Sequence, residues 1–178
     1  MVIATDTQWE GREWPLERFM AVAEKIAGMK AGWSIVFLGT HAAKGRALAA
    51  YLADSPVERG IINLIGKTSF MAYVSLIAHA RFVLANESSA IHIAAAASVP
   101  ALAVAGGGHW GRFIPYRCEF GMERAPFIVK AFMDCYGCEW QCRFPRKKGF
   151  PVRCIEVLDE ALVWKEVERI LKPLAARN

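Results

Sequence analysis

The chain has 178 residues, enough for one domain with a sizeable hydrophobic core. Apolar residues make up 54 % of the sequence and charged residues 22 %, a composition that excludes a disordered chain. The formal net charge of +5 is a modest basic excess. The first residues, MVIATDTQWEG, lack a basic stretch followed by an apolar one, so we expect no targeting segment there.

Short apolar runs alternate along the chain with amphipathic segments of helical length. In chain order we expect a strand (2–5), a helix (15–27), a strand (34–38), a helix (44–52), a strand (61–65), a helix (68–79), a strand (81–86), a helix (90–97), a strand (100–105), an irregular cysteine-bearing region and a last helix (158–171). Pro15 suits the first turn of its helix, and either Thr68 or Ser69 can cap the third helix.

The expected strands are continuous apolar runs rather than alternating ones, which is typical of strands buried on both faces. Strands separated by helices at this spacing predict an α/β fold with a doubly wound, mainly parallel, Rossmann-like sheet. The sequence has no internal repeat and no convincing linker. We therefore expect residues 1–178 to form a single domain.

Residues 86–108, NESSAIHIAAAASVPALAVAGGG, are the nearest candidate for a membrane span. A transmembrane helix needs about 20 mostly apolar residues in a row. Here His92, Ser98 and Pro100 interrupt the run and three glycines close it, so we expect no span. The same stretch instead predicts a strand, a turn and a helix whose small residues let it lie close to the sheet.

The turn in this stretch marks a candidate binding site. Ligands of open α/β sheets bind outside the carboxyl ends of the strands, and a helix N-terminus suits phosphate. Ser88 and Ser89 add hydroxyl groups there, and His92 lies one turn into the helix, either at the mouth of the site or as a core histidine. A G-x-G-x-x-G fingerprint is absent, so the residues alone predict an anion-binding α/β domain.

Five cysteines and no secretory signal favour a reducing compartment. The C-x2-C pair of Cys135 and Cys138, with Cys142 and Cys154 beyond it, is typical of one half of a zinc knuckle. A matching second pair is missing, so these are weak metal candidates, and the alternative is a compact loop of reduced thiols. We expect no metal, with Cys118 as a lone filler.

Basic residues gather in the segment RFPRKKGFPVR: Arg143, Arg146, Lys147, Lys148 and Arg153. Such a cluster meets phosphates of a nucleic acid, an anionic lipid surface or a sugar nucleotide, or is simply a solvated loop.

Residues 63–108 begin NLIGKTSF, continue through the helix and strand before ESSAIHIAAAA, and end in VPALAVAGGG. Upstream stands REWPLERFMAVAEKI, and downstream CYGCEWQCRF and RCIEVL. In this order the segments resemble family 9 of the glycosyltransferases, the heptosyltransferase type. That family carries L-x-G-K-T-S-L, then D-T-G-x-x-H-x-A-A-A, a basic residue before W-P, and a cysteine-bearing tail.

The resemblance implies the C-terminal, donor-binding half of a two-domain GT-B glycosyltransferase. It implies an ADP-heptose type of donor, inversion at the anomeric carbon, no cofactor and no obligatory metal. The N-terminal half, which binds a lipopolysaccharide-core acceptor and supplies a catalytic aspartate, has no counterpart in these residues. We therefore expect no catalytic residue here, and no sugar transfer by the chain alone.

Carried over position by position, the resemblance implies that Arg12, Ser88 and Ser89 bind the donor phosphates. The small hydroxyl-bearing residues that the family has just upstream of its basic residue fall near Thr5, Thr7 and Gln8. Donor-sugar contacts fall on Glu87 and His92. Three positions depart from the family pattern: Glu87 replaces aspartate, Ser89 replaces glycine, and Lys44 with Arg46 stand where an acid often holds the ribose.

Two other functions stay open. The first is a non-catalytic nucleotide-binding or regulatory module that kept the fold. The second is a metal-dependent nucleic-acid-binding module, which the doubly wound pattern and the lack of aromatics on a basic sheet face disfavour.

For a glycosyltransferase domain we expect a cytoplasmic location, with peripheral contact at the anionic inner face of a bacterial membrane. We also expect Trp9, Trp110 and Phe113 to be exposed on the face that meets the acceptor half.

Overall fold

The computed structural model describes residues 1–29, 32–54, 60–116 and 125–175. Six strands in these residues form one parallel sheet in the order β3-β2-β1-β4-β5-β6. This confirms the expected Rossmann-like α/β fold. The strands are β1 (Val2–Ala4), β2 (Ile35–Leu38), β3 (Ile61–Asn63), β4 (Val83–Asn86), β5 (Ala101–Val104) and β6 (Phe127–Val129).

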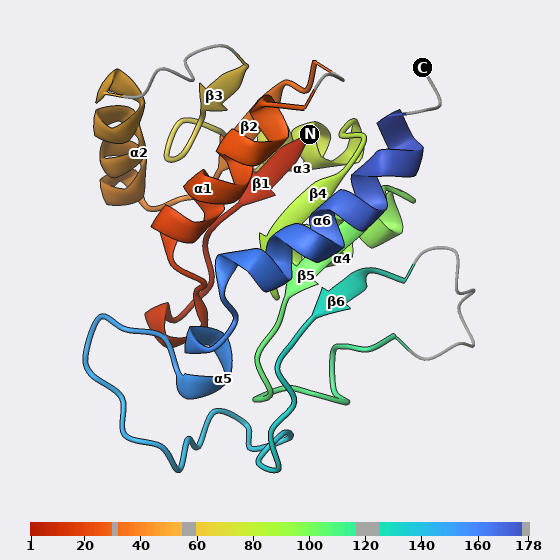
Figure 1. Cartoon of the computed structure of the whole chain (residues 1–178). Helices are drawn as coiled ribbons and strands as arrows, with labels where there is room; N and C mark the ends of the chain where they lie inside the picture. Colours follow the sequence, from red (N-terminus) through yellow and green to blue (C-terminus); the bar gives the residue numbers. More distant parts are fainter. Residues whose placement is uncertain (30–31, 55–59, 117–124, 176–178) are drawn as a thin grey trace.

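Helices cover both faces of the sheet, with α1 and α6 on one face and α3 and α4 on the other (Figure 1). Each face has its own core: Phe19 of α1 and Val167 of α6 belong to one buried cluster, and Ile77 of α3 and Ala90 of α4 to the other. No helix among the described residues combines the length and apolar character needed to cross a bilayer. The helices are η1 (Glu10–Arg12), α1 (Leu16–Ala27), α2 (Ala42–Asp54), α3 (Phe70–Ala78), α4 (Ser89–Ala96), α5 (Arg153–Glu156) and α6 (Glu160–Ala175).

Every strand and helix expected from the sequence overlaps an observed one. Ser69 rather than Thr68 caps α3, since its side chain accepts a hydrogen bond from the backbone N–H of Ala72 at 3.2 Å. The expectation of irregular structure after 105 was wrong at β6, which pairs with β5. This edge strand has three residues and an exposed Phe127, so it lacks the continuous apolar run that marks a buried strand.

Asn86, at the carboxyl end of β4, links that strand to the segment that follows β1. Its fully buried amide accepts a hydrogen bond from the N–H of Trp14 at 2.8 Å and donates one to the carbonyl of Thr5 at 2.7 Å. The indole of Trp14 then donates to the carbonyl of Leu158, just before α6, at 2.6 Å. The backbone around Arg12 and Glu87 is thereby fixed from both sides.

We predict that Asn86→Ala lowers the free energy of unfolding by about 1–3 kcal/mol. The substitution leaves the N–H of Trp14 buried without a partner, and it leaves the carbonyl of Thr5 with Lys44 as its remaining side-chain donor. Urea denaturation measures this loss. Ser75→Ala, at an exposed position of α3, is the control and should change stability by less than about 0.5 kcal/mol. Equal stability of the two variants would contradict the role given to Asn86.

Candidate functional site

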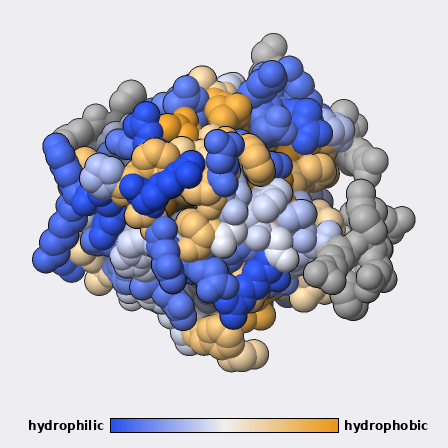
Figure 2. All heavy atoms as spheres, turned by 90° about the horizontal axis from the view of Figure 1, so that it is seen from below, coloured by the Kyte–Doolittle hydropathy of each residue, from blue (hydrophilic) through white to orange (hydrophobic). Residues whose placement is uncertain are grey.

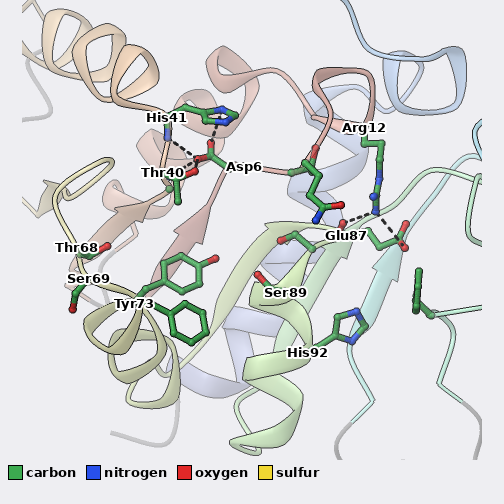
Figure 3. A pocket seen from close by; sticks show the side chains of 16 residues that line it. Asp6, Arg12, Thr40, His41, Thr68, Ser69, Tyr73, Glu87, Ser89 and His92 are labelled. Carbon is green, nitrogen blue, oxygen red and sulfur yellow. Dashed lines mark hydrogen bonds and ion pairs between the residues drawn. The ribbon is translucent and has the colours of Figure 1, made fainter.

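A cavity of about 790 Å³ opens at the carboxyl ends of β1, β2, β3 and β4 (Figure 3). Its size falls within the roughly 300–1,000 Å³ typical of small-molecule sites. It lies where the strand order reverses, between β1 and β4, which is the usual place for a ligand in this kind of sheet. Seven of the eight residues named for the donor line it: Thr7, Gln8, Arg12, Glu87, Ser88, Ser89 and His92. The eighth, Thr5, is buried outside the lining.

Arg12 and Glu87 form one wall of the cavity. One guanidinium nitrogen of Arg12, Nη2, donates to the backbone carbonyl of Glu87 at 3.1 Å and lies 3.8 Å from the carboxylate oxygen Oε1. The guanidinium also lies over the ring of Trp140, 4.8 Å from its centroid. Nevertheless the Nε of Arg12 and both carboxylate oxygens of Glu87 are buried without a hydrogen-bond partner. These polar atoms are held in place with bonding capacity left for a ligand.

The carboxyl group of Glu87 is 5 % exposed, and burial raises its pKa to about 7 while the charge of Arg12 opposes that shift. Near neutral pH the carboxyl group is therefore divided between its protonated and ionised forms. The protonated form donates one hydrogen bond and the ionised form only accepts, so both kinds of sugar hydroxyl contact are open to Glu87.

The N-terminus of α4 faces the cavity. The first N–H groups of a helix have no partner within it, and they carry the positive end of the helix dipole. Ser88 is the N-cap residue, yet its side chain makes no capping bond and its hydroxyl oxygen is buried without a partner. The hydroxyl of Ser89 is hydrogen-bonded to Tyr73 of α3. Of the two serines, Ser88 is therefore the one with a hydroxyl free for an anion.

Asp6 forms the opposite wall of the cavity, and protein groups already occupy its carboxylate with hydrogen bonds. Its carboxylate accepts hydrogen bonds from the backbone N–H and hydroxyl of Thr40, from the N–H of His41 at 3.0 Å, and from Lys44 at 2.9 Å. Burial pushes the pKa of Asp6 upward, but Lys44 and the N–H groups together lower it to about 2. A side chain at Gly39 would collide with this carboxylate, since an added Cβ would lie 2.7 Å from Oδ2.

Lys44 does not take the place of the ribose-binding acid. Its ammonium bridges the carboxylates of Asp6 and Glu13, at 2.9 and 2.8 Å, and Arg46 is exposed outside the cavity lining. Ligand atoms of Asp6, Glu13 and His41 lie within 4.8 Å of one another. Because the ammonium of Lys44 already lies between the two carboxylates, we assign no metal to this group.

Thr7, Gln8 and His92 lie at the mouth of the cavity, and their side chains differ in how firmly they are held. Thr7 donates its hydroxyl to the carbonyl of Trp9 at 2.7 Å and its N–H to Glu13 at 3.1 Å, so it holds the turn after β1. Gln8 is exposed and free to turn toward a ligand. His92 is half-buried, with its Nδ1 2.7 Å from the hydroxyl of Tyr116, and burial lowers its pKa.

The loops after β2 and β3 and the first turn of α3 complete the lining. These residues were not predicted for the site, although the rule that ligands bind at strand ends points to both loops. Together the loops and the turn contribute Thr40, His41, Thr68, Ser69, Phe70 and Tyr73.

Trp9 and Trp110, which we expected to be exposed, are half-buried, because aromatic residues of the cysteine-bearing segment pack against them. Trp9 packs edge-on against Trp140, and Trp110 packs against Tyr136. Of the three aromatic residues expected at that face, only Phe113 is exposed.

Cys135, Cys138, Cys142 and Cys154 line a second, smaller cavity beside Gly107. Cys118 lies outside the described residues.

In the basic segment, Arg146 pairs with Glu10 and Arg153 with Glu156, whereas the other three cations, Arg143, Lys147 and Lys148, are exposed.

Residues 1–122 match the family model described as glycosyltransferase family 9 (heptosyltransferase), which covers more than half of the chain. The chain belongs to glycosyltransferase family 9. No curated protein sequence shows a significant match.

Solved structures of family 9 proteins share the fold at low sequence identity. The Escherichia coli ADP-heptose lipopolysaccharide heptosyltransferase II has a TM-score of 0.69 at 18 % identity, over 97 % of this chain and 46 % of that one. E. coli heptosyltransferase WaaC with ADP-2-deoxy-2-fluoro heptose gives 0.62 and 18 %, over 94 % and 42 %. The dodecameric, iron-containing heptosyltransferase TibC of enterotoxigenic E. coli, in complex with ADP-D-β-D-heptose, gives 0.61 and 18 %, over 97 % and 45 %. The chain thus spans less than half the length of these family 9 structures.

The raised pKa of Glu87 predicts a pH-dependent stability. Between its ordinary value of 4.5 and about 7, the folded chain keeps a proton that the unfolded chain has released. This contribution to stability is complete below pH 4.5 and is lost as the pH rises through about 7. We expect Glu87→Gln, which mimics the protonated form, to be more stable than the parent at pH 8 by about 1–3 kcal/mol, and by less at pH 5.

Urea denaturation of both proteins at several pH values measures this difference. Glu17→Gln, at an exposed position of α1, is the control and should track the parent at every pH. A Glu87→Gln difference that does not change with pH would show that the carboxyl group titrates normally.

Proposed function

We propose that the 178 residues form the nucleotide-sugar-binding half of an inverting GT-B glycosyltransferase. The observation that carries the proposal is the convergence, on one cavity, of Arg12 after β1 with Glu87, Ser88 and the α4 N-terminus after β4. A guanidinium and a helix N-terminus together suit a diphosphate, and a buried carboxyl group without a partner suits sugar hydroxyls.

The proposed donor is a nucleoside diphosphate sugar of the ADP-heptose type. Family membership supports this, as do the ADP-heptose ligands named for WaaC and TibC. The diphosphate would lie between Arg12 and the N-terminus of α4, with the sugar at Glu87 and His92. Gln8 is free to contact the phosphates, while Thr7 would contribute mainly by holding the turn.

The proposed reaction is a direct displacement at the anomeric carbon, in which the acceptor oxygen forms the new bond as the nucleoside diphosphate leaves. Arg12 and the α4 N–H groups stabilise the negative charge that grows on the leaving phosphates. The acceptor hydroxyl must lose its proton to a base. Asp6, with a pKa of about 2, is a weak base, and Glu87 would be engaged with the donor sugar. The base would therefore come from an acceptor-binding half.

The proposed setting is synthesis of lipopolysaccharide core or a related surface glycan, in the cytoplasm. Exposed Arg143, Lys147 and Lys148 support contact with an anionic membrane surface. Figure 2 views the molecule from below, the side on which the basic segment lies in Figure 1, and hydrophilic side chains predominate there with hydrophobic ones in separate patches. This favours contact by charge rather than by insertion.

A second candidate is a nucleotide-binding module that transfers no sugar. The bond between Ser89 and Tyr73 and the bond between Thr7 and Trp9 favour it, because both engage hydroxyl groups at positions that the family pattern gives to phosphate. Both candidates bind a nucleoside diphosphate, so an assay of sugar transfer to an acceptor is needed to separate them.

The first prediction tests the donor site. We expect ADP to bind the chain saturably, with UDP and GDP as comparisons in isothermal titration calorimetry. Arg12→Ala should weaken binding about tenfold to a hundredfold, the loss expected for hydrogen bonds to a charged group. Arg46→Ala removes the same charge at an exposed position outside the cavity and should bind as the parent does. Absence of saturable heat with all three nucleotides would overturn the donor site.

The second prediction tests transfer. We expect the 178-residue chain, given ADP-heptose and a lipopolysaccharide-core acceptor, to release no ADP and to leave the acceptor mass unchanged. Adding the acceptor-binding half of a family 9 enzyme as a separate chain is the positive arm. Sustained glycosylation by the 178 residues alone would contradict the assignment to a donor-binding half, and donor binding without transfer in the positive arm would favour the non-catalytic module.

A further inference from the structure

We propose that Phe113 is a specificity-determining residue, whose ring packs against the transferred sugar and favours a nucleotide sugar over the bare nucleotide. The inference rests on the proposed function, because it deepens the assignment of the same cavity. Phe113 lines this cavity and is 45 % exposed. From the sequence we expected the residue only on a face that meets the acceptor half.

The donor cavity has two ends that differ in chemistry (Figure 3). Arg12, Glu87 and His92 lie at one end. The loops after β2 and β3 form the other end together with Tyr73 of α3, and Ser89 at the start of α4 lies between the two. A donor whose diphosphate lies at Arg12 and the N-terminus of α4 therefore extends its sugar toward one end and its nucleoside toward the other.

Phe113 belongs to the end with Arg12 and His92. Its ring meets the imidazole of His92 edge-on, with 6.4 Å between the two ring centroids. The ring also meets His109 edge-on, at 5.1 Å. His109 in turn packs against Trp140, the indole over which the guanidinium of Arg12 lies. These ring contacts place Phe113 at the sugar end of the cavity.

A tight turn after β5 fixes the backbone on both sides of Phe113. The N–H of Phe113 donates to the carbonyl of His109 at 3.4 Å, and the N–H of Gly111 donates to the carbonyl of Ile114 at 2.8 Å. Gly111 has a φ of 82°, which glycine adopts at no steric cost. Ile114 is completely buried and anchors the turn. Because the backbone is already ordered, a ligand that covers the ring loses little affinity to ordering the turn.

His109 supports the ring of Phe113 as a neutral imidazole. Burial and then the charges of Arg12 and Arg112 lower its pKa, and the charge of Glu139 opposes them only in part. Near neutral pH the side chain therefore adds no positive charge beside the ring. The surface that Phe113 and His109 present to the cavity is aromatic and uncharged.

One charged side chain does touch the ring. The guanidinium of Arg112 lies over Phe113, 5.2 Å from the ring centroid, and pairs with Glu139 at 3.4 Å. Both charged side chains are exposed, and an exposed pair of this kind contributes little free energy. A sugar can therefore displace Arg112 from the ring without breaking a buried interaction.

The groups at this end suit a sugar better than a phosphate or a base. A pyranose carries hydroxyl groups around its edge and C–H bonds on its faces, so it needs both polar and apolar partners. Both carboxylate oxygens of Glu87 are free for the hydroxyl groups, and the ring of Phe113 can cover a C–H face. A bare nucleotide ends at its phosphates, so it does not reach Phe113.

The test compares ADP-heptose with ADP in isothermal titration calorimetry of the 178-residue chain. We expect the parent to bind ADP-heptose more tightly than ADP. Phe113→Ala should lower the affinity for ADP-heptose about tenfold and keep the affinity for ADP within about twofold. Phe113→Tyr keeps the aromatic ring and should keep the preference, whereas Phe113→Leu, which is apolar but has no ring, should lose most of it.

Phe70→Ala is the matched control. Phe70 lines the other end of the same cavity and is 71 % exposed, so its loss should leave the ratio of the two affinities unchanged. The melting temperature of each variant shows whether it has folded.

Equal losses for ADP and ADP-heptose in Phe113→Ala would place the ring at the nucleotide, and no loss for either would leave it only on the face toward an acceptor half. Either result would overturn the proposal, and so would a parent that binds ADP but gains nothing from the heptose. A parent that binds neither compound would instead overturn the donor site itself, so the two failures can be told apart.

Discussion

The buried amide of Asn86 is the interaction on which the arrangement of this molecule depends. Where the strand order of a parallel sheet reverses, a crevice opens outside the carboxyl ends of the two strands, and the segments that follow them must be held across it. Asn86 does this by bonding the backbone of Trp14 and Thr5 at once. Arg12 lies two residues before Trp14, and Glu87 follows Asn86 directly, so the wall of the cavity that Arg12 and Glu87 form is positioned by one side chain.

Two carboxyl groups in the same cavity have opposite protonation behaviour for reasons that are visible in their partners. Asp6 has an ammonium and several N–H groups at hydrogen-bond distance, so its negative charge is stabilised despite burial. Glu87 is buried with Arg12 as a distant partner at 3.8 Å, so desolvation dominates. The cavity therefore combines a fixed negative charge on one wall with a carboxyl group that responds to its ligand on the other.

The sheet and its helices were predictable because continuous apolar runs and helix-starting residues are local signals. The site was predictable in part, since Arg12 and Glu87 each follow a strand and belong to motifs of the family. What the sequence could not give depends on contacts between distant residues. The pairing of Lys44 with Asp6 joins positions 38 apart in the chain. The packing of Trp9 against Trp140 likewise needs the cysteine-bearing segment to fold back over the end of the sheet.

The position of Trp140 has a spectroscopic consequence. Its indole lies against the guanidinium of Arg12 on one side and near His109 and Trp9 on the others. Indole emission is sensitive to neighbouring charge, and an anion that draws Arg12 into the cavity alters the field at the ring. Trp14, by contrast, is enclosed in the core and does not line the cavity. Among the six tryptophans of the chain, Trp140 is therefore placed to change its emission when a ligand engages Arg12.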